Sequence, residues 1–146
     1  MYLIRKATPT DCHIVGFLAN QLWPHHNETE LESEFSFLLT RPDAVIFIAF
    51  KEDSPAGFAQ CQLRHDYVEG TVSSPVGYLE GIFVIPAYRK TGIARALVAA
   101  CEGWAKEHGC AEFASDCELA NEESLRFHLN VGFYEANRII CFTKKL

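Results

Sequence analysis

The chain has 146 residues, of which 49% are hydrophobic and 22% charged, and its formal net charge is −6. This length suits one domain with a packed core, so we expect a single domain over residues 1–146. The acidic balance disfavours a nucleic-acid partner, because domains that bind DNA or RNA are more often basic. No apolar run approaches the length of a membrane span and no secretory signal is visible, so we expect a cytoplasmic protein without a membrane partner.

Six cysteines stand at positions 12, 61, 101, 110, 117 and 141. No two have the Cys-x-x-Cys spacing, so neither a zinc ribbon nor a thiol redox motif is predicted, and no metal is expected as a cofactor. Cys101 falls on an apolar helix face, and Cys61 and Cys141 fall in strand-like runs. We interpret the cysteines as small, reduced, buried hydrophobic residues.

The first half of the chain predicts a strand, two helices and a hairpin. Residues 2–7 alternate as a strand, and the first helix then starts at Thr8-Pro9 and ends near Trp23-Pro24. Asn27 can cap a second helix over 27–40, whose acidic residues are read as a solvated face, with some of them candidates to border a cation site. A buried strand over 44–50, a turn over 51–57 and a strand over 58–67 complete the hairpin.

The stretch over 78–105 organises the second half. An apolar strand over 79–85 ends at Pro86, a basic turn follows with Arg89, Lys90 and Gly92, and a long amphipathic helix starts at Ile93. The first turn of a helix has unpaired N–H groups and partial positive charge, so this arrangement predicts an anion site. The G-x-x-x-x-G-K-[ST] pattern of a P-loop and the G-x-G-x-x-G pattern of a dinucleotide site are both absent.

The C-terminal part predicts a short strand over 112–116, a helix over 122–130 capped by Asn121, and closing strands. The closing strands open at 132–135 and finish at 139–143.

Two motifs carry a resemblance to a known family. Arg89-Lys90-Thr91-Gly92-Ile93-Ala94 fits [RQ]-x-x-G-x-[GA] between a strand and a helix, and the second motif reads Asn121…Ser124…Phe127-His128…Gly132-Phe133. Both are similar to motifs of the GCN5-related N-acetyltransferases (GNAT). The resemblance implies a mixed α/β GNAT fold, with a mostly antiparallel twisted central sheet of about six to seven strands and flanking helices. It also implies acetyl-CoA as co-substrate.

A closer resemblance covers nearly the whole chain. Segments 21–24, 64–68, 73–84 and 114–116 resemble the aminoglycoside 6′-N-acetyltransferases. This implies acetyl transfer from acetyl-CoA to the 6′-amino group of aminoglycoside antibiotics by direct attack in a ternary complex, and hence resistance to them. The alternatives are an acetyltransferase for another small amine or a protein N-terminus, and a non-catalytic acyl-CoA sensor.

The resemblance also implies a set of site residues. The cofactor contacts, to which Arg89 adds charge, are Ile82, Phe83, Val84, Arg89, Lys90, Thr91, Gly92, Ile93, Ala94, Arg95 and Asn121. The substrate contacts are Trp23, His26, Tyr67, Glu80, Asp116 and Asn137. Asn137 is a departure, because the family often has Glu there.

The residue chemistry agrees with a polycationic amine as substrate. Such a substrate needs carboxylates and a flat wall for its rings, for which Trp23 is a candidate, although a core role for it is equally open. An ammonium is not a nucleophile, so Glu80 is the first candidate for the base that deprotonates it and Asp116 the second, with simple charge binding as the alternative for Glu80. A backbone N–H within 81–84 is the candidate oxyanion donor. Tyr134 is considered as proton donor to the thiolate, but a core or surface role is favoured.

The resemblance also implies a homodimer through the C-terminal strands. The apolar run over 139–142 offers a suitable edge for it.

Overall fold

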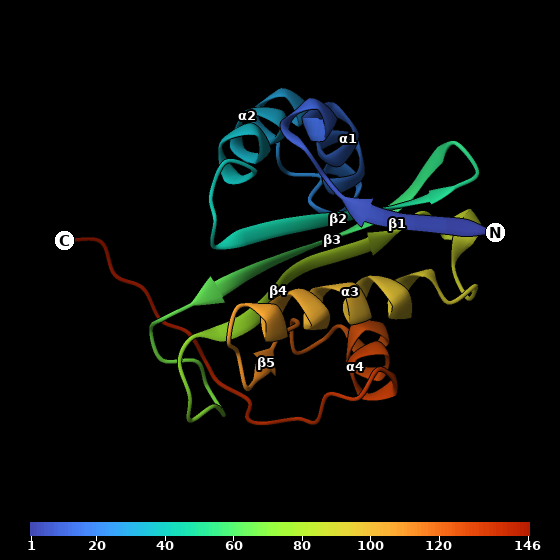
Figure 1. Ribbon diagram of the computed structural model, residues 1–146. Coiled ribbons are helices and arrows are strands. Elements are labelled where there is room, and N and C mark those ends of the chain that lie inside the picture. The colour runs from blue at the N-terminus through green and yellow to red at the C-terminus, as the bar shows by residue number, and fades with distance from the viewer.

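One mixed sheet forms the middle layer of the molecule (Figure 1). The computed structural model describes residues 1–146, and the strands lie in the order β1-β2-β3-β4-β5. Neighbouring strands are antiparallel except for the parallel pair of β4 and β5. The bounds are Tyr2–Lys6 for β1, Ala44–Lys51 for β2, Ser54–Arg64 for β3, Val76–Val84 for β4 and Phe113–Ala114 for β5.

Helices cover both faces of the sheet. Figure 1 shows α1 (Cys12–Leu22) and α2 (Glu28–Leu38) on one side, with α3 (Ile93–Glu107) and α4 (Glu122–Asn130) on the other. Single 3-10 turns, Pro9–Asp11 (η1) and Pro86–Tyr88 (η2), precede α1 and follow β4. None of the helices combines the length and the apolar composition needed to cross a membrane.

The interior strand β2 is buried on both faces, as its continuous apolar sequence predicts. Val45, Phe47 and Ala49 belong to the core cluster beneath α3, whereas Ile46 and Ile48 pack with α1 and α2. Because successive side chains of a strand point to opposite faces, one apolar run supplies both cores. The sheet is therefore a partition between two separately packed layers.

The β2–β3 hairpin is tighter than predicted. Ser54 pairs with Lys51 and Pro55 with Phe50, so the turn consists of residues 52 and 53 rather than 51–57. Glu52 adopts a positive φ of 55°, which allows the two-residue turn. The prediction was wrong because Ser54 and Pro55 were read as turn residues, yet Pro55 lies where the register shifts and a proline is tolerated. The strand β3 also ends at Arg64, before Tyr67.

A β-bulge interrupts β4 at Glu80. Gln60 of β3 pairs with Gly81 and Cys61 pairs with Leu79, which leaves Glu80 as the extra residue. A bulge changes which face later side chains point to. Leu79 before it and Ile82 after it both pack in the α3 core, although three positions separate them.

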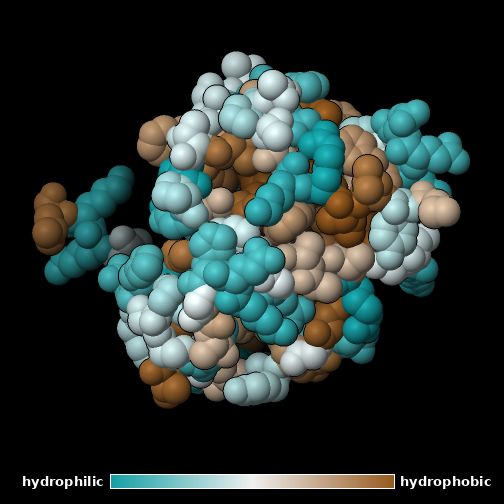
Figure 2. All heavy atoms as spheres, viewed as in Figure 1, coloured by the Kyte–Doolittle hydropathy of each residue, from teal (hydrophilic) through white to brown (hydrophobic).

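The predicted closing strands are absent, and the sheet has five strands in place of six to seven. Residues beyond the turn at Gly132 contain no strand, and in Figure 1 the C-terminal tail leaves the body of the molecule. Its large apolar side chains are exposed: Ile139 by 66%, Ile140 by 81% and Phe142 by 90%. An extended apolar segment becomes a strand only when another strand supplies hydrogen-bond partners, and here the tail meets none. Figure 2 shows hydrophobic atoms on this isolated tail.

The cysteines are all free. Cys61 and Cys101 are buried as predicted, and contact with Cys61 together with burial raises the pKa of the Cys101 thiol. Cys12 and Cys110 are half-buried. Cys117 and Cys141 are exposed, so the prediction of buried cysteines was wrong for these two, and Cys141 is exposed because its predicted strand is absent.

Candidate active site

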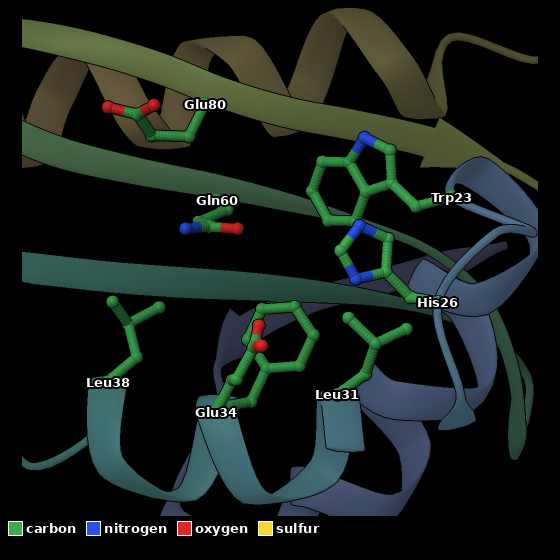
Figure 3. Close-up of a pocket in the computed structure, with 8 residues that line it drawn as sticks. Trp23, His26, Leu31, Glu34, Leu38, Gln60 and Glu80 are labelled. Atoms are coloured by element: carbon green, nitrogen blue, oxygen red, sulfur yellow. The ribbon is translucent and has the colours of Figure 1, made fainter. Parts of the chain in front are cut away.

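A pocket of about 320 Å³ lies between α2 and the sheet face formed by β3 and β4. In Figure 3, side chains rise from α2 on one side, others come from the strands opposite, and Trp23 and His26 close one end from the loop after α1. The pocket is lined by Trp23, His26, Leu31, Glu34, Phe35, Leu38, Gln60 and Glu80. Three of the predicted substrate residues, Trp23, His26 and Glu80, are thus brought together although they are far apart in the chain.

Trp23 serves both as wall and as packing residue. Its ring meets Phe58 edge-on at 6.2 Å between centroids, which ties it to the core beneath α1. It also lies directly over Gly81, where an added Cβ would come within 2.7 Å of the indole. Only glycine on β4 lets the indole lie this close. The core role of Trp23 is thus confirmed, and its place in the pocket lining is compatible with the predicted substrate contact, which stays a prediction.

The loop that carries His26 is held by hydrogen bonds from its own backbone and from two asparagine side chains. The N–H of His26 donates to the Trp23 carbonyl at 3.1 Å, and Asn20 Nδ2 donates to the His26 carbonyl at 2.6 Å. Asn27 then caps α2 by accepting from the N–H groups of Thr29 and Glu30, as predicted. These bonds fix the end of the pocket independently of any substrate.

Glu80 is half-buried and paired with a cation. Arg64 donates to both of its carboxylate oxygens, through Nε at 2.9 Å and Nη2 at 2.7 Å. The carboxylate raises the pKa of Arg64, and the fork-to-fork geometry fixes the direction of both side chains. The bulge brings Gly81 to the same face as Glu80, where the pocket lies.

Asp116 joins the same group through two intermediates. The Tyr78 hydroxyl donates to Asp116 Oδ2, and the Arg64 guanidinium carbon lies 3.4 Å from the centre of the Tyr78 ring. Burial, then the bond to Asp116, raises the pKa of Tyr78, so its hydroxyl stays protonated. The two predicted carboxylates are therefore the ends of one chain, Glu80–Arg64–Tyr78–Asp116, which we call the carboxylate bridge.

The other two predicted substrate residues lie outside the pocket. Tyr67 is 76% exposed. Asn137 stands on the C-terminal segment, where its amide donates to Glu69 Oε1 at 2.7 Å.

The turn after β4 has the backbone of an anion site. Lys90 and Gly92 both have positive φ, 62° and 88°, and Gly92 is the N-cap residue of α3. The bond from the Ala96 N–H to the Gly92 carbonyl is the first that closes α3, so the N–H groups of Ile93, Ala94 and Arg95 have no intrahelical partner. Three free donors at the positive end of a 15-residue helix favour a phosphate group.

Three exposed side chains at this turn and at the start of α3 donate hydrogen bonds to backbone carbonyls. Arg89 Nε donates to the Val84 carbonyl at 2.8 Å, Thr91 Oγ1 to the Tyr88 carbonyl at 2.6 Å, and Arg95 to the Asn130 carbonyl at 2.7 Å. Lys90 makes no ion pair or side-chain hydrogen bond, so it is the cation of the turn that is free to meet an anion. Asn121 caps α4 by accepting from the Ser124 N–H at 3.1 Å.

Between the pocket and the turn, one edge of β4 has no strand beside it. Pairing with β5 covers only Gly77 and Tyr78, so Ile82, Phe83 and Val84 lie beyond it. At this opening His128 Nε2 lies 2.8 Å from Ser115 Oγ, which in turn reaches the Leu79 carbonyl at 3.4 Å. The free edge is long enough to accept an extended ligand between the turn and the carboxylate bridge.

Sequence reasoning missed four residues of the site: Glu34, Gln60, Arg64 and Tyr78. Glu34 belongs to the acidic row of α2, where a cation site was one candidate reading. Arg64 and Tyr78 gave no usable signal, because their meeting depends on the β3–β4 register and the bulge within it.

Comparison with known proteins agrees with this geometry. The sequence model of the acetyltransferase (GNAT) family matches residues 8–133. An aminoglycoside N(6′)-acetyltransferase type 1 of Acinetobacter genomosp. 13 is 42% identical over 130 residues, or 88% of each chain. One from Salmonella enteritidis is 41% identical over 97% of this chain and 98% of its own.

Solved structures show the same likeness in three dimensions. AAC(6′)-Iy in complex with the bisubstrate analogue CoA-S-monomethyl-acetylneamine superposes with a TM-score of 0.96 at 38% identity, covering 100% of this chain and 99% of that one. The apo enzyme AAC(6′)-Ig from Acinetobacter haemolyticus gives a TM-score of 0.93 at 36% identity, covering 99% of each. The chain therefore belongs to the GNAT acetyltransferase family, in the group of the aminoglycoside 6′-N-acetyltransferases.

Proposed function

We propose that this protein transfers the acetyl group of acetyl-CoA to the 6′-amino group of aminoglycoside antibiotics and so confers resistance to them. One observation carries the proposal: Trp23, His26 and Glu80 line one pocket beside the free edge of β4, which leads to the open N-terminus of α3. The relatives that match most of the chain are named for this activity, and AAC(6′)-Iy binds an analogue that joins CoA to an acetylated neamine.

The cofactor fits the free edge and the turn. The pyrophosphate of acetyl-CoA would meet the N–H groups of Ile93, Ala94 and Arg95, with Lys90 adding charge. Its extended arm would lie along the backbone of 82–84, which has no neighbouring strand. Asn121 keeps its amide NH₂ group for a further contact, since capping α4 uses only its oxygen.

The aminoglycoside fits the pocket as a polycation. Glu34 supplies negative charge, Glu80 offers the carboxylate lone pairs that Arg64 leaves free, and the Trp23 ring supplies a flat wall for a sugar. The reacting amine would stand at the carboxylate bridge, between Glu80 and Asp116. Tyr67 and Asn137 would reach the substrate from the exposed rim.

The reaction is a direct acyl transfer in a ternary complex. The amine gives up a proton, with Glu80 as first candidate base and Asp116 as second, and its lone pair attacks the thioester carbonyl carbon. A backbone N–H within 81–84 stabilises the oxyanion, the C–S bond then breaks, and the CoA thiolate takes up a proton. Tyr134 is 81% exposed, which supports a surface role for it rather than proton donation. Holding both substrates side by side supplies much of the rate.

The proposed assembly is a cytoplasmic homodimer. The exposed apolar side chains of Ile139, Ile140 and Phe142 support a partner for the C-terminal tail. A second copy that supplied strand partners for this tail would bury these side chains and complete its backbone hydrogen bonds.

The deciding experiment measures release of free CoA thiol from acetyl-CoA with a panel of amines. The panel holds a kanamycin-type aminoglycoside, its 6′-hydroxyl analogue, a polyamine and a peptide N-terminus. We expect turnover with the 6′-amino compound and none with the 6′-hydroxyl one. Turnover with the polyamine or peptide alone would refute the aminoglycoside proposal while keeping the acetyltransferase.

The role of Glu80 is tested by Glu80→Gln. General-base catalysis contributes about 10²–10⁴-fold, so kcat should fall by at least about 100-fold if Glu80 takes the proton. A rise in KM at unchanged kcat would show instead that Glu80 only binds charge. Asp116→Asn measured in parallel decides between the two candidate bases.

A further inference from the structure

The carboxylate bridge contains a cation, Arg64, to which the proposed acetyl transfer assigns no role. A site for a polycation should be negative, yet Arg64 occupies both oxygens of Glu80, at 2.9 and 2.7 Å. Its guanidinium is also stacked on Tyr78, whose hydroxyl holds Asp116. Arg64 is thus fixed within the carboxylate bridge, although its side chain is still 42% exposed.

The carboxylate of Glu80 has more lone pairs than Arg64 uses. A bidentate guanidinium occupies one side of a carboxylate, and the remaining lone pairs still accept a donor. An amine can therefore bind Glu80 while Arg64 stays in place. The amine then sits near a carboxylate whose charge is already balanced, with a fixed positive charge close by.

That environment acts on the protonation of the amine. A nearby like charge disfavours the charged form of a titratable group, and an unbalanced carboxylate favours the ammonium form. Only the neutral amine can attack the thioester. A site with two unpaired carboxylates would bind the ammonium tightly and hold it in the unreactive form.

We propose that Arg64 is a positioning residue that aligns Glu80 with Tyr78 and Asp116 and, as a fixed cation, favours the neutral, reactive form of the bound amine. This rests on the proposed function, since it takes the reacting amine to lie at the carboxylate bridge. It gives the guanidinium a role in reactivity rather than in binding.

Other charged and titratable groups surround this position. Tyr78 and Glu80 face Arg64 from β4, and Asp116 faces it from the segment after β5. Glu34 of α2 and His26 of the preceding loop line the pocket shared with Glu80. Arg64 is the permanently charged cation among them, so its removal changes the field at every pH at which the enzyme is assayed.

The test replaces Arg64 by Gln, which keeps hydrogen-bond donors but removes the charge, and by Lys, which keeps the charge. Rates with a kanamycin-type substrate are measured from about pH 6 to pH 9. In Arg64→Gln we expect the rising limb of the kcat–pH profile to shift to higher pH by about one unit, with KM unchanged or lower. In Arg64→Lys the limb should stay near its wild-type position, with a reduced kcat.

Arg41 provides a matched control. It makes the same two-bonded ion pair with Asp43, at 2.9 and 2.7 Å, outside the pocket. Arg41→Gln should leave the pH profile unmoved. If Arg64→Gln lowers kcat and raises KM with the limb in place, Arg64 has only a structural role and the proposal is wrong.

A binding experiment separates this inference from the proposed function. Calorimetric titration of the enzyme–CoA complex, in two buffers of different ionisation heat, gives the protons released when the aminoglycoside binds. Wild type should release more protons with the 6′-amino compound than Arg64→Gln does, and the 6′-hydroxyl analogue should show no such difference. Equal release refutes the role of Arg64 alone, whereas no binding to wild type refutes the aminoglycoside function and this inference with it.

Discussion

Gly81 is the residue through which the sheet sets the position of Trp23. A methyl group there would stand 2.7 and 2.8 Å from two carbons of the indole, so the ring has to move. For Gly81→Ala we expect KM for the aminoglycoside to rise by roughly tenfold, because the pocket wall is displaced, while KM for acetyl-CoA changes little. Steady-state kinetics with each substrate varied in turn measure both.

Whether the effect passes through Trp23 is decided by a double-mutant cycle. In a Trp23→Ala background the indole is already gone, so Gly81→Ala should then add almost nothing to KM. Equal effects in both backgrounds would place the defect in the β4 backbone instead.

Gly92 is the second position where the backbone requires glycine, here because of its positive φ. Its φ of 88° is strained for any residue with a side chain, although its Cβ would meet nothing closer than the Tyr2 hydroxyl at 3.8 Å. Gly92→Ala should therefore destabilise the fold by about 1–3 kcal/mol. It should also raise KM for acetyl-CoA, because the N–H groups at the start of α3 would no longer be oriented toward the pyrophosphate. Urea unfolding and thiol-release kinetics check the two effects.

Gly103 is the matched control for Gly92. It lies within α3, has no positive φ, and a Cβ added to it would meet no atom within 4 Å. Gly103→Ala should therefore stabilise the helix by about 0.5–1 kcal/mol. A stabilising Gly92→Ala would show that the turn relaxes freely and would remove the strain argument.

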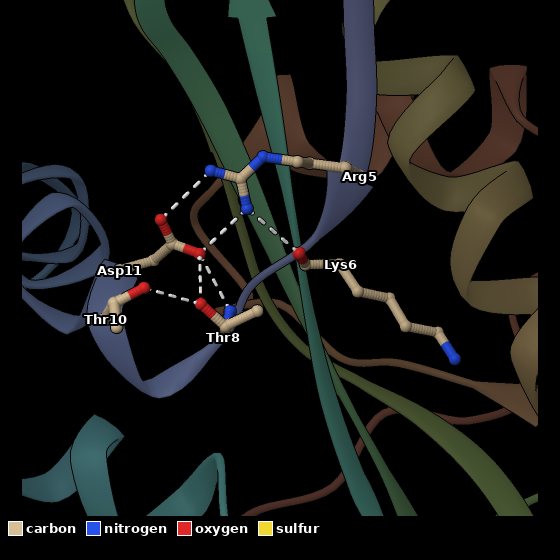
Figure 4. A network of polar contacts seen from close by, with 5 residues as sticks. All are labelled: Arg5, Lys6, Thr8, Thr10 and Asp11. Atoms are coloured by element: carbon tan, nitrogen blue, oxygen red, sulfur yellow. Dashed lines mark hydrogen bonds and ion pairs between the residues drawn. The ribbon is translucent and has the colours of Figure 1, made fainter.

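At the scale of elements, β1 is tied to the entry of α1 by one ion pair. Arg5 donates to both oxygens of the buried Asp11, at 2.8 and 3.0 Å, and the Thr8 N–H donates to the same carboxylate at 2.8 Å (Figure 4). The Arg5 guanidinium, with the Thr8 bonds, holds the pKa of Asp11 well below its ordinary range.

This ion pair predicts a pH dependence of stability. An acid whose pKa is depressed in the folded state adds stability above its unfolded pKa, about 4, and loses it as pH falls toward the folded value. Asp11→Asn should lower the free energy of unfolding by about 1–2 kcal/mol at pH 7, a figure reduced for solvent around the half-exposed Arg5.

Urea unfolding at pH 7, 5 and 3 measures this difference. It should be equal at pH 7 and pH 5 and smaller at pH 3. A difference that does not change with pH would mean that Asp11 stabilises the turn through packing alone.

The bulge in β4 is the element that connects fold to chemistry. Without it, the strict alternation of β4 would continue, and Gly81 would point to the face opposite the one that Tyr78 shares with Glu80. With it, Tyr78, Glu80 and Gly81 share the pocket side of β4, and Ile82 and Val84 are turned to pack under α3. One extra residue therefore supplies both the carboxylate and the place for the indole.

For the whole molecule, the C-terminal tail is the segment whose apolar side chains stay exposed and whose backbone finds no strand partner within one copy of the chain. If a second copy covers it, wild type should sediment as a dimer and Ile140→Asp should shift toward the monomer, because a carboxylate is costly to bury. Sedimentation velocity over a concentration series measures this. Lys144→Ala, on the same tail, is a control that should leave the dimer intact. A monomeric wild type would remove the dimer proposal.

The sequence predicted much of the fold because its signals are local. Three predictions that depend only on neighbours within a few positions are confirmed. They are the strand β2 with apolar side chains on both faces, the caps by Asn27 and Asn121, and the amphipathic helix α3. The predicted turn over 51–57 and the closing strands were wrong because their outcome depends on pairing with other segments.

What the sequence alone determined is therefore the order of elements, the turn and helix start suited to an anion, and the carboxylates available to a cationic substrate. The tertiary structure decided how those groups are used. The β3–β4 register brings Arg64 to Glu80, the bulge turns Gly81 to the face of Glu80 and the pocket, and Tyr78 connects Arg64 to Asp116. Hydrogen bonds between residues far apart in the chain exist only once strands have paired, so no local pattern could have shown that Arg64 and Tyr78 connect the two carboxylates.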